Sequence, residues 1–349
     1  MTTDSESPEK PRVGITLGDP AGIGPEIVLK SVAERCLLEA CRPVIIGSAL
    51  QLHRQAELLG LPHGFQSYPE NDIGLLTGEA PVIVDTGPGD HDIRWGALSS
   101  HAGQQAVAAV ETAVRLCLSG SLDAVATAPL NKEALQMSGS PYPGHTELLA
   151  SLCNAPTPLM CFFAEHLKVF LLTVHLSLAK AIAAISKEKV VESVRIADRE
   201  LRRFGIARPR IAVAGLNPHA GEHGLFGTED QDEIEPAIIE CRTRHGIDVN
   251  GPYPADTIFL RAWRREFDAV AACYHDQGLI AVKCLAFGKA VNVTLGLPII
   301  RTSVDHGTAF DIAGRGVADP QSMVEAILLG AKLVAQQKSH SKSKEILST

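Results

Sequence analysis

Short apolar runs alternate with longer amphipathic segments along most of the chain. The runs are rich in β-branched residues, and polar loops with glycine or proline follow them, which is typical of buried strands. The segments between them carry apolar residues at helical spacing, as in the alanine-rich stretch 101–120. This alternation predicts an α/β protein with an extensively buried sheet. Strands are expected within 12–18, 42–48, 80–87, 122–130, 167–175, 208–221, 267–278 and 289–298.

The stretch GDPAGIGPE at 18–26 joins the first predicted strand to a predicted helix over 24–40. It resembles half of a dinucleotide-binding fingerprint, but it lacks the complete GxGxxG pattern and a clear strand-end acid about 20 residues later. We therefore interpret it as a strand–turn–helix corner with Pro25 in the first helical turn. A phosphate-binding loop is the alternative interpretation.

Composition narrows the class of protein. The chain has 349 residues, of which 45% are hydrophobic, and a net charge of −8, so more than one domain is expected. This acidic balance disfavours nucleic acid and anionic membranes as partners, and an anionic substrate therefore needs a local cationic cluster. The polar N-terminus lacks a signal peptide's apolar region, and no apolar run reaches the roughly 20 residues of a membrane span. Eight cysteines without a CxxC pair are typical of free thiols, and we expect a cytoplasmic protein.

Three histidines follow three of the predicted strands. His175 ends LLTVH, His219 lies just past IAVAGLNP, and His275 ends AVAACYH. Open α/β sheets bind ligands at these carboxyl ends. Three imidazoles with an open position are typical of a catalytic zinc site, and neutral imidazole also suits other transition metals. No local motif such as HExxH relates the three, so a hydrogen-bonded structural role stays open for each.

Further polar residues accompany apolar runs. Lys283 and Arg301 flank runs that should be buried, and Asn292 lies inside one. Buried polar groups need partners, and a bound phosphate or carboxylate would serve all of them. His145 and Thr146 in PYPGHTELLA are further candidates. For a lone arginine or lysine, the alternative is a solvated surface charge.

Several segments together resemble the 4-hydroxythreonine-4-phosphate dehydrogenase family of pyridoxal phosphate synthesis. They are GDPAGIGPE, TAPLNKEAL, GHTELLA, GLNPHAGE, GPYPADT, YHDQGL and VNVTLGLPIIRTSVDHGTAFDIAGRG, and they extend from about Val13 to about Gly330. The resemblance implies a fold similar to those of isocitrate and isopropylmalate dehydrogenases, with two α/β domains and a cleft between them. The implied domains are 12–140 with 305–335 on the cofactor side, and 141–304 with the metal ligands and dimer contacts. We expect 1–11 and 337–349 to be disordered.

The resemblance also implies the partners and the residues of the site. Members of the family bind a divalent metal (zinc, magnesium or cobalt) through three histidines from two subunits of a homodimer, which match His175, His219 and His275. The positions that match substrate-binding groups are His145, Thr146, Lys283, Asn292 and Arg301. The segment DHGTAFDIAGRG resembles the adenine-side loop of isocitrate dehydrogenase-like folds, which implies cofactor contacts at Asp305, His306, Gly307 and Asp311.

The implied reaction is the metal-dependent, NAD- or NADP-linked oxidation of 4-phosphooxy-L-threonine. Its product, 2-amino-3-oxo-4-phosphooxybutanoate, decarboxylates to 3-amino-2-oxopropyl phosphate during pyridoxine 5′-phosphate biosynthesis. Lys283 is one candidate for the general base. Asp256 in PADT is the other, and its alternative role is to cap a helix or to orient a histidine ligand.

Other functions remain open. Paralogues of the family oxidise 4-phospho-threonate, which lacks the amine, or cyclic dihydrodiol carboxylates. The five substrate-matching residues favour a phosphorylated substrate over the dihydrodiols. A zinc hydrolase is a more remote alternative that the DHGTAFDIAGRG loop disfavours. A non-catalytic metal-binding protein is disfavoured by the number of polar groups in the loops.

Overall fold

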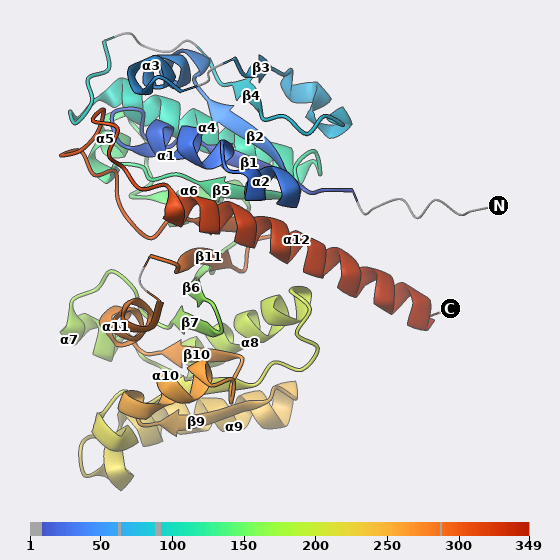
Figure 1. Ribbon diagram of the computed structural model, residues 1–349. Helices are drawn as coiled ribbons and strands as arrows, with labels where there is room; N and C mark the ends of the chain where they lie inside the picture. Colours follow the sequence, from blue (N-terminus) through green and yellow to red (C-terminus); the bar gives the residue numbers. More distant parts are fainter. Residues whose placement is uncertain (1–8, 62–63, 88–91, 287, 349) are drawn as a thin grey trace. The chain divides into compact units, whose positions relative to one another are not determined.

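The structure is a computed structural model that describes residues 9–61, 64–87, 92–286 and 288–348. The chain divides into two compact units: unit 1 comprises Met1–Pro156 and Pro298–Ala335, and unit 2 comprises Thr157–Leu297 and Gln336–Thr349. Each unit combines strands with helices (Figure 1), which confirms the predicted α/β class. Residues 141–156, which hold His145 and Thr146, belong to unit 1 and not to the unit of residues 157–297.

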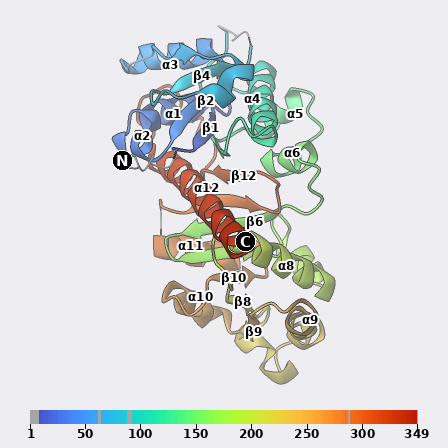
Figure 2. The same cartoon turned by 90° about the vertical axis from the view of Figure 1, so that its right-hand side faces the viewer.

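Unit 1 contains a parallel sheet in the order β3-β4-β2-β1-β5-β12. Its strands are β1 (Arg12–Thr16), β2 (Arg42–Gly47), β3 (Gln66–Ser67), β4 (Val82–Asp85), β5 (Ala124–Thr127) and β12 (Ile300–Ser303). Its helices are α1 (Gly24–Val32), α2 (Arg35–Ala40), α3 (Ala49–Leu59), η1 (Glu70–Leu75), α4 (Ser100–Leu118), α5 (Lys132–Met137), α6 (His145–Leu152) and the first part of α12 (Gln321–Ser348). Figure 2 shows α1 and α4 on opposite sides of β1 and β2. Both faces of these strands are therefore covered, which explains their almost unbroken apolar sequences.

The parallel register places the loops that follow three strands of unit 1 at the same end of the sheet, where the strands have their carboxyl ends. Thr16 pairs with Thr127, and Thr127 pairs with Ser303, so β1, β5 and β12 end side by side. The loop after β1 leads into α1 at Gly24, which confirms the strand–turn–helix corner. The predicted continuous helix over 24–40 is wrong, because extended backbone at Glu34 separates α1 from α2.

Unit 2 contains a mixed sheet in the order β11-β6-β7-β10-β8-β9, in which β6 is antiparallel to both neighbours. Its strands are β6 (Leu159–Ala164), β7 (Leu167–Leu171), β8 (Ile211–Ala214), β9 (Val249–Tyr253), β10 (Ala269–Ala272) and β11 (Val291–Leu295). Its helices are α7 (Leu178–Ala183), α8 (Lys187–Arg203), η2 (Pro218–Gly224), η3 (Asp230–Ile234), α9 (Glu235–His245), α10 (Ala255–Trp263) and α11 (His275–Ala286).

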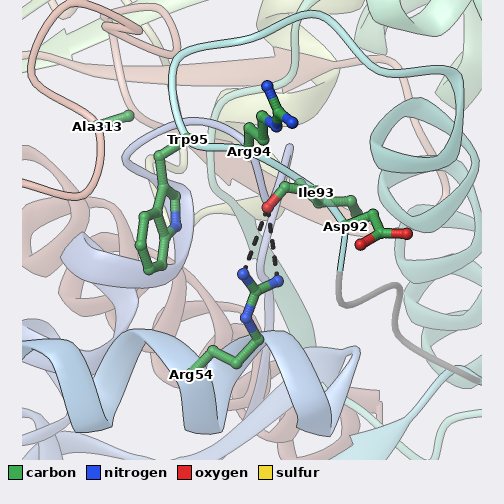
Figure 3. Close-up of a pocket in the computed structure, with 6 residues that line it drawn as sticks. All are labelled: Arg54, Asp92, Ile93, Arg94, Trp95 and Ala313. Carbon is green, nitrogen blue, oxygen red and sulfur yellow. Dashed lines mark hydrogen bonds between the residues drawn. The ribbon is translucent and has the colours of Figure 1, made fainter.

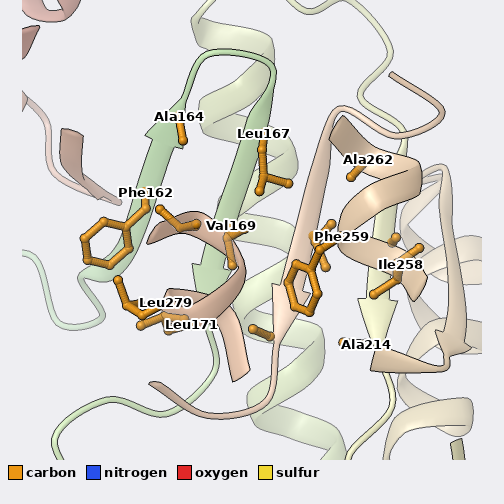
Figure 4. Close-up of a cluster of buried hydrophobic side chains, with 14 of the residues drawn as sticks. Phe162, Ala164, Leu167, Val169, Leu171, Ala214, Ile258, Phe259, Ala262 and Leu279 are labelled. Carbon is orange, nitrogen blue, oxygen red and sulfur yellow. The ribbon is translucent and has the colours of Figure 1, made fainter. Parts of the chain in front are cut away.

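The apolar core of unit 2 fixes α10 and α11 on the sheet. Phe259 of α10 and Leu279 of α11 pack with Val169 and Leu171 of β7 (Figure 4). Burial of each such side chain contributes about 1.5–3 kcal/mol. The close approach of α11 requires glycine at 278, because a Cβ there would lie 2.8 Å from Leu171 Cδ2. This packing sets the position of His275, the first residue of α11.

The C-terminal segment departs from expectation. The expected disorder of 337–349 is wrong for residues 337–348, because α12 continues to Ser348. Buried Met323, Ile327 and Val334 hold the first part of this helix, and good helix formers such as Ala335 and Gln336 follow them. Of the other segment expected to be disordered, residues 9–11 lead into β1 without regular structure. Residues 1–8 and 349 lie outside the described residues.

Two predictions made from composition, on the cysteines and on membrane spans, can be compared with the structure. All eight cysteines lie within the described ranges and are free thiols, as predicted. In the part of the chain that the structure describes, no helix is long and apolar enough to cross a membrane.

Candidate functional site

Arg301 of β12 is a buried cation near the carboxyl ends of the strands of unit 1. Only 2% of the residue is exposed. Its Nη2 and Nε donate to Thr127 Oγ1 at 2.7 and 3.2 Å, and Thr127 ends the neighbouring strand β5. Burial lowers the pKa of Arg301 to about 9, so the guanidinium stays protonated at neutral pH. A bound anion would offset the cost of removing this charge from water.

His145 begins α6 and lies within electrostatic reach of Arg301. The residue is partly exposed, but its Nε2 is enclosed and has no hydrogen-bond partner among the described residues. Burial, and then the positive charge of Arg301, lower the pKa of His145 well below its usual value, so the imidazole is neutral at pH 7. Thr146 follows in the first turn of α6, whose backbone N–H groups favour an anion. Arg301, His145 and this helix terminus thus form a candidate oxyanion site.

Lys132 is a second cation near this site, and the predictions from sequence did not include it. It begins α5, where Asn131 Oδ1 caps the helix by accepting from the N–H groups of Glu133 and Ala134. Lys132 Cε lies 3.6 Å from the position of a Cβ at Gly144, the residue before His145. The signal in the sequence was TAPLNKEAL, in which a helix cap and a lysine follow a buried strand.

The predicted cofactor residues all lie in the loop after β12. Ser322 Oγ donates to Asp305 Oδ1 at 3.2 Å, and His306 Nδ1 donates to the Gly307 carbonyl oxygen at 3.0 Å. Asp311 is exposed farther along the loop. The N–H of Ile23, within GDPAGIGPE, donates to the Thr308 carbonyl oxygen at 3.0 Å. The two segments considered for phosphate or dinucleotide binding are therefore in direct contact.

A pocket of about 890 Å³ adjoins the same loop (Figure 3). Arg54 of α3 reaches toward the Ile93 carbonyl oxygen, and its guanidinium carbon lies 5.5 Å from the centre of the Trp95 ring. Trp95 packs closely on Gly314, where a Cβ would come within 2.8 Å of the indole. The lining residues are Arg54, Asp92, Ile93, Arg94, Trp95 and Ala313, and none of them was predicted as a site residue.

Unit 2 holds the three histidines just past the carboxyl ends of three neighbouring parallel strands. In its parallel strands, Ala272 of β10 pairs with Leu171 of β7, and Ala271 pairs with Val213 of β8. The loops that carry His175, His275 and His219 leave these strands at those ends. The metal prediction made from the sequence depends on this arrangement, in which three histidines follow the carboxyl ends of strands.

The structure brings two of these histidines together. The ring centroids of His175 and His275 lie 6.0 Å apart, whereas the ring of His219 lies 6.1 Å from that of Phe226. Within the described residues, no group of three His, Cys, Asp or Glu side chains is arranged to hold a metal ion.

The residues present nevertheless fit a metal ion. His275 Nδ1 donates to Asp276 Oδ1 at 2.7 Å, which leaves Nε2 as the nitrogen available to a metal. The His275 side chain is 43% exposed, and His175 and His219 are exposed as well. These imidazoles are accessible to an ion and to further ligands.

The remaining predicted residues of unit 2 differ in their surroundings. Lys283 is exposed on α11, eight positions after His275 and therefore about 12 Å farther along the helix axis. Asn292 Oδ1 in β11 is buried without a hydrogen-bond partner among the described residues, so it is available to a ligand. Asp256 is exposed in the first turn of α10, where the helix dipole favours a carboxylate.

Fold and site together are those of an α/β protein with a candidate oxyanion site in unit 1 and exposed histidines at strand ends in unit 2. The family model described as pyridoxal phosphate biosynthetic protein PdxA matches residues 39–330. The chain therefore belongs to the PdxA family, as the sequence motifs predict.

Three comparisons show the extent of the similarity. The chain is 44% identical to 4-hydroxythreonine-4-phosphate dehydrogenase of Geobacter metallireducens, over 93% of this chain and 96% of the relative. It is 45% identical to D-threonate 4-phosphate dehydrogenase of Cupriavidus necator, over 94% of this chain and 98% of the relative. The crystal structure of a 4-hydroxythreonine-4-phosphate dehydrogenase from Burkholderia phymatum superposes with a TM-score of 0.83 at 45% identity, covering 93% of this chain and 98% of that chain. The protein is a dehydrogenase, and the zinc hydrolase and the non-catalytic metal-binding protein are set aside.

Proposed function

We propose that this enzyme oxidises the secondary alcohol of a four-carbon acid that carries a 4-phosphate, using NAD or NADP and a divalent metal. The observation that carries the proposal is the enclosed pair in unit 1, formed by protonated Arg301 and neutral His145 with an unpartnered Nε2. A phosphate oxyanion satisfies both groups. It also explains why an acidic chain buries an arginine beside a helix N-terminus.

Two substrates fit this description. One is 4-hydroxythreonine 4-phosphate, the substrate expected from the sequence motifs. The other is D-threonate 4-phosphate, which is favoured by the name of the Cupriavidus necator relative. The two differ at carbon 2, which bears an ammonium group in the first and a hydroxyl in the second. The oxyanion site accepts either, so the groups that contact carbon 2 decide between them.

The chain's own side chains have distinct tasks in the proposed mechanism. Arg301 binds two phosphate oxygens with its planar fork, and the first turn of α6 contributes N–H donors. Asn292 Oδ1 accepts a hydrogen bond from the substituent at carbon 2. Lys283 is the proposed base for the proton of the alcohol, with Asp256 as the alternative, and a bound NAD or NADP would supply the hydride acceptor for carbon 3. The resulting 3-oxo acid then loses carbon dioxide.

The metal and the dinucleotide are assigned to separate residues. A divalent ion held by His175, His219 and His275 would supply Lewis-acid chemistry at the alcohol oxygen. The loop residues Asp305, His306, Gly307 and Asp311 would hold the dinucleotide, and the exposed Asp311 carboxylate would offer an acceptor to its hydroxyl groups.

A substrate panel tests this function. The purified enzyme is incubated with 4-hydroxythreonine 4-phosphate, D-threonate 4-phosphate and their unphosphorylated parents, with NAD and NADP in turn. Absorbance of the reduced cofactor reports turnover, before and after chelation and reloading with zinc, magnesium or cobalt. We expect turnover of a phosphorylated compound only, and its loss on chelation. No reduced cofactor with either phosphorylated compound would refute the proposal.

We further propose that the enzyme works as a homodimer whose metal site takes histidines from both subunits. Large exposed apolar side chains flank the histidine-bearing loops, and these are Leu176, Leu178, Phe226 and Ile280. Sedimentation should give twice the 37.2 kDa mass of the chain. Leu178→Asp should yield monomers with weakened metal binding, whereas Ile239→Asp, at an exposed apolar residue of α9, should remain dimeric. A fully active wild-type monomer would contradict this assembly.

A further inference from the structure

His219 lies in a run of five residues with left-handed backbone. The φ angles from His219 to His223 are 55°, 55°, 81°, 41° and 56°, and only Gly221 among the five is a glycine. A left-handed conformation costs other residues about 1–2 kcal/mol each, or roughly 4–8 kcal/mol for the four. Such strain persists only where surrounding contacts hold the backbone in place.

Asp230 provides contacts of this kind immediately before the left-handed run. The residue is 0% exposed. Its Oδ1 accepts from the Leu216 N–H at 2.8 Å, and its Oδ2 accepts from the Asn217 N–H at 3.1 Å and from Asn217 Nδ2 at 3.0 Å. Each hydrogen bond to a charged group contributes about 1.5–3 kcal/mol, so the set is comparable in size to the backbone strain. Asp230 therefore holds the segment that leads into His219.

The packing around this turn leaves little room for other arrangements. A Cβ at Gly215 would lie 2.8 Å from Ala220 Cα and 3.2 Å from Asp230 Oδ1. The end of β8, the left-handed run and the Asp230 carboxylate are thus in direct contact.

Gln277, in the first turn of α11, connects this region to the start of that helix, where His275 lies. Its Oε1 accepts from the Cys273 N–H at 2.6 Å, and its Nε2 donates to the Gly215 carbonyl oxygen at 2.8 Å. Thr173, two residues before His175, donates from Oγ1 to the Cys273 carbonyl oxygen at 2.8 Å. The ends of β7, β10 and β8 are therefore joined by side-chain hydrogen bonds.

We propose that Asp230 and Gln277 are positioning residues that hold His219 and His275 ready for metal binding. The inference rests on the proposed role of these histidines as metal ligands. Neither positioning residue is itself a proposed ligand. A preorganised backbone raises metal affinity because little ordering remains to be done on binding. Changing a residue that orients a ligand typically lowers metal affinity about 10- to 100-fold.

Two substitutions test the proposal with little change in volume. Asp230→Asn replaces one acceptor oxygen with an NH₂ group, which cannot accept from Leu216 or Asn217. Gln277→Glu keeps an oxygen for the Cys273 N–H and removes the donor to Gly215. Asp232→Asn is the matched control, because Asp232 is an exposed carboxylate in the same short helix.

The measurements are cobalt titration of the metal-free protein, followed by absorbance, and amide hydrogen exchange of residues 215–224 without metal. Asp230→Asn should weaken cobalt binding about 10- to 100-fold and accelerate exchange at Leu216 and Asn217. Gln277→Glu should act in the same direction by a smaller factor. Asp232→Asn should match the wild type, and thermal melting should show a folded protein in each case.

Wild-type cobalt affinity in both folded variants would overturn the proposal, even where exchange becomes faster. If Asp230→Asn does not fold, Gln277→Glu decides the question alone. Failure of the wild-type protein to bind cobalt refutes the proposed metal role of the histidines instead. In that case the exchange comparison still tests the positioning role, and unchanged protection at Leu216 and Asn217 in Asp230→Asn overturns it.

Discussion

Unit 1 and unit 2 hold their candidate ligand-binding groups in opposite ways. In unit 1, Arg301 and Nε2 of His145 are enclosed, so the binding groups themselves have lost water. In unit 2, the imidazole of His219 is exposed, while the carboxylate that holds its loop, Asp230, is buried. On the proposed assignments, burial encloses the anion-binding groups of unit 1, whereas around His219 in unit 2 it encloses the carboxylate that holds the backbone.

Physical chemistry explains why each arrangement suits its ligand. A phosphate binds most tightly to donors that are already desolvated, because their electrostatic attraction is screened less. A metal ion needs neutral nitrogen donors at set positions, and exposed imidazoles provide them only when the backbone is rigid. Changes in unit 1 should therefore weaken anion binding, and changes in unit 2 should weaken metal binding.

The largest effect is expected from His219→Ala. We expect activity to be lost and divalent metal affinity to fall at least about tenfold, with the fold intact, because one of the proposed nitrogen ligands is removed. Metal content and circular dichroism measure the two parts. His223→Ala is the control, since His223 is also exposed and has the same left-handed backbone, with φ of 56°. Unchanged metal content in folded His219→Ala would contradict the assignment.

Arg301→Lys should have the next largest effect. An ammonium cannot reproduce the two parallel hydrogen bonds of a guanidinium fork, so KM for the phosphorylated substrate should rise. The expected loss is about 1.5–3 kcal/mol, or roughly 10- to 150-fold. Metal affinity and KM for the cofactor should stay near wild type, which would separate the two units experimentally.

Arg210→Lys is the control for Arg301→Lys. Arg210 forms an ion pair with Asp268 in unit 2, where its side chain is 46% exposed. It should leave KM for the substrate unchanged. If Arg301→Lys also keeps the wild-type KM, Arg301 is a structural residue and the oxyanion site is misassigned.

The third effect concerns stability and not function, and it comes from the cost of burying charge in unit 1. Burial raises the pKa of Asp19 to about 6, although the N–H groups of Ala21 and Asn131 lower it. The folded protein therefore binds a proton more readily than the unfolded chain between about pH 4 and pH 6, and stability falls as pH rises through this window. Asp19→Asn removes the titration. It should raise the free energy of unfolding at pH 8 by about 3 kcal/mol at most, with no gain below pH 4.

Urea unfolding of the wild type and Asp19→Asn at pH 8 and pH 4 measures this difference. Asp232→Asn serves as the exposed control and should change stability little at either pH. A gain at pH 4 as large as that at pH 8 would show that the effect does not come from ionisation of Asp19.

The positions of the histidines illustrate what local sequence determines. Each follows a short apolar run, and a buried run of that length forms a strand because its residues favour extended backbone and both sheet faces are covered. His175, His219 and His275 could therefore be placed at strand ends from the sequence, and β7, β8 and β10 do lie side by side and parallel. The motifs shared with the PdxA family predicted the family for the same reason, since they are contiguous in the chain.

Features without a local signal could not be predicted in this way. The break between α1 and α2 has no glycine or proline at residues 33–34. The backbone from His219 to His223 is left-handed at four residues that seldom adopt this conformation. The proximity of Lys132 to Gly144 depends on how α5 and α6 pack. In each case the local preference is weak or opposed, and contacts from elsewhere in the chain decide the conformation.

The sequence by itself thus determined the α/β class, the strand ends that carry the histidines, and the family. The tertiary structure alone decided that His145 lies within electrostatic reach of buried Arg301, and that Asp230 and Gln277 bond to the backbone at Leu216 and Gly215. Strand ends follow from hydrophobic patterning over a few residues, which any stretch of sequence displays. The nearness of His145 to Arg301 and the hydrogen bond between Gln277 and Gly215 each join segments far apart in the chain, which only the packed fold brings together.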